Sequence, residues 1–105
     1  MLNAALQQVL AFRQQHEASF PWPGPLWSAL YVHEELSELM RVVQQYLAPA
    51  HQRAAPRHAT AEQLQFEAGQ LLFMVFTLLY ELGITDLDQA LQSALMALHE
   101  RLEAR

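Results

Sequence analysis

The ten residues from Leu71 to Tyr80, LLFMVFTLLY, constrain the fold more than any other stretch of this 105-residue chain. They carry no charge, and on a helix they would be apolar on nearly every side, which predicts burial all round. The run is too short to cross a bilayer, which needs roughly 20 apolar residues. Because a large apolar side chain stabilises a fold by about 1.5–3 kcal/mol when it is buried, this segment is expected to dominate the core.

Local signals place this run inside a long helix. Thr60 and Gln63 fit a capping box at its start, and Gly83 suits the position just after a helix C-terminus. Gly69 lies in the helix interior, where glycine costs about 1 kcal/mol relative to alanine. We therefore expect a close helix crossing at Gly69, which would bring Glu67 near a second helix.

Apolar residues recur at helical spacing in three further segments, and no segment alternates as a strand would. Prolines interrupt the helical pattern at Phe20–Pro25 and at Ala48–Ala59. The sequence therefore predicts one domain over residues 1–105, an all-α four-helix bundle. The expected helices are Asn3–Ser19 with Asn3 as N-cap, Pro25–Tyr46, Ala61–Leu82, and a last helix that starts at Thr85 as N-cap.

The composition excludes several classes of function. The net charge of −5 argues against a protein that binds the phosphate backbone of a nucleic acid, since that needs a basic surface. The absence of cysteine excludes disulfides, thiolate metal sites and cysteine nucleophiles. The first ten residues lack the basic start and apolar run of a secretory signal, so we expect a cytoplasmic protein with no membrane partner.

Two short segments of acidic and amide residues, here named the acidic steps, lie on the second and third expected helices. They are residues 34–38 and residues 67–70. Glu34, Glu35 and Glu38 fall within one short stretch, and residues three or four apart share a helix face. Like charges so placed repel, and a shared Mg²⁺ would remove this penalty because carboxylates are hard oxygen ligands. Taken alone, these three acids are better explained as a solvated face. Glu67, which lies in the most apolar helix, shifts the balance towards a metal site.

Other catalytic templates do not fit. Glu35 and Glu67 lack the histidine three residues later that di-iron bundles need. His33 and Glu34 begin like a zinc-protease motif, but Ser37 stands where that motif has its second histidine. The chain has neither a glycine-rich phosphate loop nor a G-x-S-x-G turn.

The sequence EELSEL at residues 34–39 and EAGQLL at residues 67–72 resembles the signature of the MazG-like, all-α nucleoside triphosphate pyrophosphohydrolases. That signature is E-x-x-E followed, after one to three dozen residues, by E-x-x-D. The resemblance extends over nearly the whole chain. It includes the glutamines of the first helix, the region of Trp22, the Leu71–Tyr80 run and the entry to the last helix.

The resemblance implies a MazG-type bundle that uses Mg²⁺, with Mn²⁺ as an alternative, to split a nucleoside triphosphate into monophosphate and pyrophosphate. By position, Glu35, Glu38, Glu67 and Gln70 would be metal ligands, and Glu34 would orient or deprotonate the attacking water. Gln70 departs from the family, which has aspartate there. Its amide oxygen can ligate Mg²⁺ but brings no charge, so the ion is attracted less strongly.

Four further residues are candidates for substrate binding. Trp22 either covers the end of the bundle, which is the better explanation, or stacks on a bound base. Arg53 and Arg57 lie in a locally basic loop that is either a linker, again the better explanation, or a phosphate contact. Arg101 is a candidate only if the family's last helix is aligned in a shifted register.

Three functions from different classes therefore stay open. The first, slightly favoured, is a Mg²⁺-dependent nucleoside triphosphate pyrophosphohydrolase with weakened metal binding. The second is a catalytically inactive relative that binds a nucleotide or a protein partner. The third is a helical oligomerisation module whose acids are solvated. In each case the Leu71–Tyr80 helix is expected to pair with another copy, in a homodimer or homotetramer.

Overall fold

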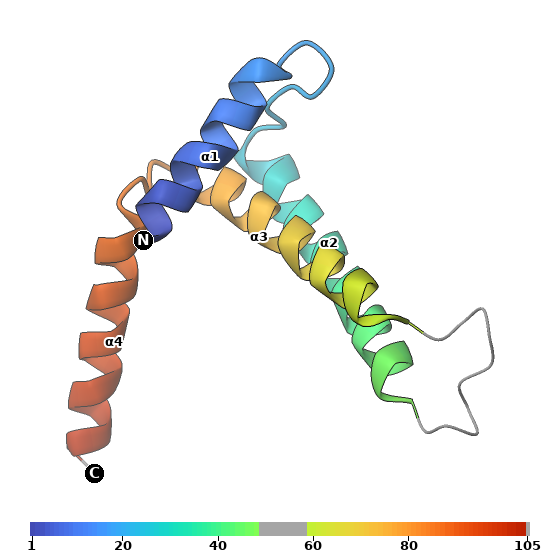
Figure 1. Ribbon diagram of the computed structural model, residues 1–105. Helices are drawn as coiled ribbons and strands as arrows, with labels where there is room; N and C mark the ends of the chain where they lie inside the picture. Colours follow the sequence, from blue (N-terminus) through green and yellow to red (C-terminus); the bar gives the residue numbers. More distant parts are fainter. Residues whose placement is uncertain (49–58, 105) are drawn as a thin grey trace. The chain divides into compact units, whose positions relative to one another are not determined.

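The computed structural model describes residues 1–48 and 59–104, and every regular element within them is an α-helix. The helices are α1 (Leu2–Gln15), α2 (Pro25–Leu47), α3 (Ala61–Glu81) and α4 (Leu87–Glu103), as Figure 1 shows. The prediction of an all-α fold is confirmed. None of the described helices combines the length and the apolar character needed to cross a membrane.

The chain divides into two compact units. The α1–α4 unit comprises Met1–Trp22 and Leu79–Arg105, and so contains α1, the last turn of α3 and α4. The α2–α3 unit comprises Pro23–Leu78 and contains α2 and the rest of α3. A single domain over residues 1–105 stays a prediction.

Both ends of α3 follow from local sequence. Gln63 N–H donates to Thr60 Oγ1 at 3.1 Å, and Thr60 N–H donates to Gln63 Oε1 at 2.8 Å, so the predicted capping box is confirmed. At the other end Gly83 has φ +84°, a left-handed conformation that residues with a Cβ rarely adopt. Gly83 N–H donates to Tyr80 O and Ile84 N–H to Leu79 O, the paired bonds that satisfy the last carbonyls of a helix.

One expectation for the interior of α3 is wrong. A Cβ at Gly69 would meet no heavy atom of the described residues within 4 Å, so these residues form no close helix crossing there. A single chain does not bury the Leu71–Tyr80 run on every side, since Leu72 is 55% exposed. Met74 and Thr77 are its buried residues, and the Thr77 hydroxyl donates to Phe73 O at 2.8 Å. One chain therefore leaves much of this apolar helix uncovered.

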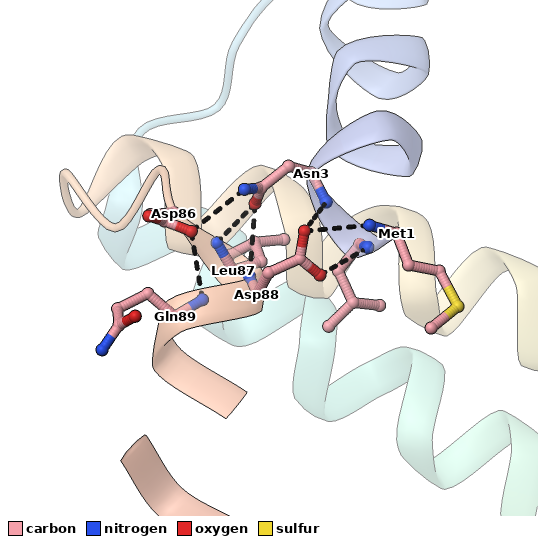
Figure 2. Close-up of polar contacts among 7 residues, drawn as sticks. Met1, Asn3, Asp86, Leu87, Asp88 and Gln89 are labelled. Atoms are coloured by element: carbon pink, nitrogen blue, oxygen red, sulfur yellow. Dashed lines mark hydrogen bonds and ion pairs between the residues drawn. The ribbon is translucent and has the colours of Figure 1, made fainter. Parts of the chain in front are cut away.

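The N-termini of α1 and α4 meet in the α1–α4 unit (Figure 2). The Asp88 carboxylate, in the first turn of α4, accepts from Leu2 N–H at 2.8 Å and Asn3 N–H at 3.3 Å. It also accepts from the amino group of Met1 at 2.9 Å. These donors have no partner within α1 itself, so Asp88 caps a helix other than its own.

Asn3, in α1, in turn caps the N-terminus of α4. Its side-chain oxygen accepts from Leu87 N–H at 2.7 Å and from Asp88 N–H at 3.3 Å, and its amide nitrogen donates to Asp86 at 3.0 Å. Asp86 is the N-cap of α4 and accepts from Gln89 N–H. The predictions of Asn3 as N-cap of its own helix and of Thr85 as N-cap of the last helix are therefore both wrong.

Electrostatics explains why two aspartates lie where the N-termini of α1 and α4 meet. Two helix N-termini that lie together bring together two positive dipole ends, and carboxylates are the groups that stabilise them. The hydrogen bonds from the Met1 amino group and Leu2 N–H lower the pKa of Asp88. Those from Asn3 and from Gln89 N–H lower the pKa of Asp86. Both carboxylates therefore stay ionised to lower pH in the folded chain than in the unfolded chain.

Asp88→Asn should reduce the loss of stability in acid. A carboxylate whose pKa is lowered on folding stabilises the protein above its unfolded pKa, about 3.9 for aspartate, and this contribution disappears as the pH falls through the folded pKa. Urea unfolding at several pH values between about 7 and 2.5 should therefore give a shallower acid slope for Asp88→Asn than for wild type. Glu100→Gln, which removes an exposed carboxylate from the same helix outside the junction, should leave the slope unchanged. Equal slopes for Asp88→Asn and wild type would contradict this account.

Candidate metal-binding site

The register of α2 is set at its first turn. Gly24 is its N-cap with φ +91°, and Pro25 follows at the first helical position, where its fixed φ and missing N–H are favourable. Ser28 N–H donates to Gly24 O at 2.8 Å, and Ser28 is fully buried. Val42, fourteen residues on, is also buried, and two helical turns span about seven residues. Glu35 lies midway between them, so it is on the buried face of α2.

The second acidic step occupies the corresponding face of α3. Glu67 precedes the buried Met74 by seven residues, and Gln70 precedes the buried Thr77 by seven residues. Glu67 is partly buried, whereas Gln70 is exposed. Glu67 therefore continues the buried stripe of α3 towards its N-terminus, and Gln70 lies three residues later at an exposed position.

Glu67 lies near enough to Glu35 to act on it across the two helices. Burial is the first cause that raises the pKa of Glu35, and the negative charge of Glu67 is the second. Glu38 and Glu34, on the same helix, raise it further. The negative charges of the two acidic steps therefore repel the Glu35 carboxylate, as the sequence predicts.

One oxygen of this group has no partner among the described residues. Glu67 Oε2 is buried and forms no hydrogen bond. A buried carboxylate oxygen without a donor is costly, and a nearby carboxylate such as Glu35 increases the cost. This oxygen is the least satisfied polar atom of the acidic steps.

Glu38 is in a different situation because Arg41, one turn later, pairs with it. Arg41 Nη2 donates to Glu38 Oε1, and Arg41 Nε donates to Glu38 Oε2 at 3.4 Å. This hydrogen bond lowers the pKa of Glu38 and raises the pKa of Arg41, and Glu67 raises the pKa of Arg41 a little more. Sequence reasoning did not identify Arg41, although glutamate followed by arginine three residues later is a recognised helical ion pair.

The donor chemistry suits a hard divalent cation, since carboxylate oxygens are what Mg²⁺ prefers and an ion would neutralise the repulsion around Glu35. Within residues 1–48 and 59–104, however, no three histidine, aspartate or glutamate side chains are arranged to hold a metal ion. Glu38 would have to leave Arg41 before it joined Glu35 and Glu67. Glu34, the predicted catalytic residue, is exposed beside them.

Trp22 lies in the other unit, where it packs on a buried arginine. The guanidinium carbon of Arg13 is 4.9 Å from the Trp22 ring centroid and 5.2 Å from that of Phe20, and the Tyr80 ring centroid is 5.2 Å from that of Trp22. Burial lowers the pKa of Arg13, and the charge of Glu81 opposes this shift. Trp22 thus has a structural role as the cover of a buried cation.

The remaining candidates for substrate binding are three arginines. Arg101 is exposed on α4, in the α1–α4 unit. Arg53 and Arg57 lie outside the described residues. The residue that the sequence analysis missed in this part of the chain is Arg13, which follows the buried Leu6 by seven residues and so lies on the buried face of α1.

No protein-family model matches the chain, and no curated protein or solved structure matches it either.

Glu35→Gln should stabilise the metal-free protein. Because the pKa of Glu35 is raised on folding, its ionised form is disfavoured in the folded chain, and the penalty is full above the folded pKa and vanishes as the pH falls to the unfolded value. With a chelator at pH 7, the free energy of unfolding should rise by about 0.2–0.5 kcal/mol, the magnitude of a like-charge pair on a helix. Glu62→Gln removes a carboxylate that favours the first turn of α3, so it should not stabilise. A loss of stability in Glu35→Gln would refute the repulsion.

Proposed function

We propose that this chain is a Mg²⁺-dependent nucleoside triphosphate pyrophosphohydrolase of the MazG-like type, able to use Mn²⁺, with metal binding weakened at Gln70. The observation that carries the proposal is the buried, partnerless oxygen of Glu67 next to Glu35, whose pKa is raised by surrounding carboxylates. A solvated acidic face would not place one of its carboxylate oxygens in such a position, because water would satisfy it.

Each residue has a distinct role in this proposal. Glu35 and Glu67 hold the ion from the buried faces of α2 and α3, Glu38 joins them after leaving Arg41, and the Gln70 amide oxygen completes the set. The ion, when bound, acts as a Lewis acid on the phosphoryl oxygens and lowers the pKa of a bound water. Glu34, exposed beside the ligands, orients the attacking water and accepts its proton.

The reaction is a hydrolysis of the bond between the α- and β-phosphates. Water attacks the α-phosphorus, and pyrophosphate leaves together with the electron pair of the broken P–O bond. The nucleoside monophosphate is the second product. The carboxylates carry no base-specific chemistry, so they recognise the triphosphate and not the base.

A catalytically inactive relative that binds a nucleotide or a protein partner is the alternative. Gln70 favours it, because a neutral ligand in place of aspartate removes one charge from the set, and so does the ion pair that occupies Glu38. An inactive relative that binds a nucleotide uses the same cation and differs from the enzyme in not cleaving the nucleotide. An inactive relative that binds a protein partner does not require the cation.

The variant Gln70→Asp distinguishes an active pyrophosphohydrolase from an inactive relative. Restoring a negative charge at this position should tighten Mg²⁺ binding and increase pyrophosphate release from nucleoside triphosphates, mainly at low Mg²⁺, where occupancy limits the rate. Calorimetric titration of Mg²⁺ and a pyrophosphate assay measure the two effects. Gln63→Asp is unsuitable as a control because it alters the capping box, whereas Gln65→Asp adds the same charge five residues before Gln70 on an exposed part of α3.

Glu38→Gln should act in the opposite direction and weaken Mg²⁺ binding while the fold persists. If wild type and Gln70→Asp both hydrolyse nothing yet bind Mg²⁺, the inactive relative is the better account. If neither variant nor wild type binds Mg²⁺, the metal-dependent functions are excluded, and an inactive relative that binds a protein partner or an oligomerisation module remains.

The proposal includes a homodimer or homotetramer with α3 at or near the interface. The support is the apolar surface that one chain leaves exposed. On α3 this surface includes Phe66, Leu72 and Tyr80, which are 63%, 55% and 40% exposed. A second apolar stripe runs along α4 at alternating spacings of four and three residues, which is typical of helices that pair. Its residues are Leu91, Leu95, Leu98 and Leu102.

Sedimentation of the wild type at micromolar concentration should therefore show a dimer or tetramer, and dilution should lower its stability. Leu72→Glu should shift the equilibrium towards monomer because it buries a charge at the proposed interface. Leu95→Glu tests the stripe on α4 in the same assay. A wild-type monomer whose stability does not change on dilution would exclude the oligomer, and dissociation by Leu95→Glu alone would move the interface to α4.

A further inference from the structure

Arg41 is the feature of the α2–α3 unit that the proposed roles do not use. The chain contains no lysine, and among residues 23–48 and 59–78 Arg41 is the only arginine. It stands one helical turn after Glu38, on the helix that also carries Glu34 and Glu35. The one permanent cation in the described part of this unit therefore lies at its acidic residues.

The contact between Arg41 and Glu38 occupies both oxygens of the carboxylate. Arg41 Nη2 donates to one oxygen and Arg41 Nε to the other, so the planar guanidinium engages the carboxylate with two N–H groups. The charge of Glu67, on α3, also acts favourably on Arg41. Arg41 thus partly neutralises the two acidic steps in the way that a bound cation would.

The same contact opposes ligation by Glu38. Each carboxylate oxygen keeps an acceptor site beside its bond to the guanidinium, but the positive charge of Arg41 repels a cation that approaches Glu38. The exchange is feasible because the side chains of Arg41 and Glu38 are 56% and 42% exposed, and exposed ion pairs of this kind are weak. A cation with two charges can therefore displace the guanidinium.

A displaced guanidinium would still be anchored one turn from the ligands. Its flat arrangement of N–H donors matches a phosphate group as well as it matches a carboxylate. A nucleoside triphosphate brings such groups to the ion. The residue that competes with the cation in the free protein thus has a second use once the cation and the nucleotide are bound.

We propose that Arg41 exchanges partners during substrate binding: it holds Glu38 in the metal-free protein, yields Glu38 to the divalent cation, and then binds the phosphates of the nucleotide. This inference rests on the proposed function, since it uses the same metal ligands and the same substrate class. It adds a competitor for the metal and a substrate-positioning residue, both provided by one side chain. It also accounts for the finding that Glu38 is paired and not grouped with the other carboxylates.

The exchange predicts opposite effects on metal and nucleotide binding in one variant. Arg41→Gln removes the competitor, so Mg²⁺ titrated alone at low ionic strength should bind roughly two- to five-fold more tightly, the range expected for an exposed ion pair. In saturating Mg²⁺, a non-hydrolysable nucleoside triphosphate should bind roughly tenfold more weakly, in line with the loss of one charged hydrogen bond. If the protein is active, KM should rise with kcat little changed.

Two further variants make the result specific. Arg41→Lys keeps the charge and loses the two-pronged geometry, so its Mg²⁺ affinity should lie between those of wild type and Arg41→Gln. Gln44→Ala changes an exposed residue one turn later on α2 and should leave both affinities unchanged. A purely structural role for Arg41 would weaken Mg²⁺ and nucleotide binding together, and thermal unfolding in chelator checks that every variant is folded.

The outcomes separate this inference from the function beneath it. If wild type binds Mg²⁺ and cleaves nucleotide but Arg41→Gln binds Mg²⁺ no more tightly, the exchange is wrong and the function stands. Tighter Mg²⁺ binding with unchanged nucleotide binding overturns the phosphate step alone. Mg²⁺ binding by Arg41→Gln but not by wild type supports the competition directly. If no variant binds Mg²⁺ or the nucleotide analogue, the proposed function and the exchange fail together.

Discussion

Negative charge on the buried faces of two helices is the constraint on which the α2–α3 unit depends. Glu35 lies midway between the buried Ser28 and Val42, and Glu67 continues the stripe of the buried Met74. Ordinary helix pairs place apolar residues at such positions, because a buried carboxylate loses its hydration and repels any neighbouring carboxylate. The raised pKa of Glu35 and the partnerless oxygen of Glu67 are the two consequences. A unit built this way is stabilised by anything that brings positive charge to the same place.

In the α1–α4 unit, charged side chains that lie close together or are buried interact with other groups of the same unit. Asp86 and Asp88 are held by the backbone N–H groups of two helix N-termini and by the side chain of Asn3, so their charges are stabilised where they stand. The buried guanidinium of Arg13 lies against the rings of Phe20 and Trp22, near Glu81. The carboxylates of Asp86 and Asp88 have hydrogen-bonded partners, as structural charges usually do. The contrast between these two carboxylates and Glu67 is the physical reason to assign a structural role to the former and a function to the latter.

Arg41 partly neutralises the negative charge of the acidic steps. It neutralises Glu38 and reaches Glu67 only through its field, which leaves the buried oxygen of Glu67 without a hydrogen bond. An exposed ion pair contributes little to stability, at most about 1 kcal/mol, so it holds Glu38 without committing it. In the proposed exchange, this weak interaction allows Arg41 to act both in the free protein and in the protein that has bound metal and nucleotide.

Features that involve neighbours in the chain were determined by the sequence itself. The all-α class, the capping box of Thr60 and Gln63 and the turn at Gly83 follow from hydrogen bonds between residues at most five apart. The spacing of the two acidic steps on their helices is equally local, so the candidate ligands could be named in advance. The tertiary structure alone decided that Asn3 caps α4 and that no described residue packs closely against Gly69. These outcomes depend on which segments distant in sequence become neighbours, and a linear pattern does not contain that information.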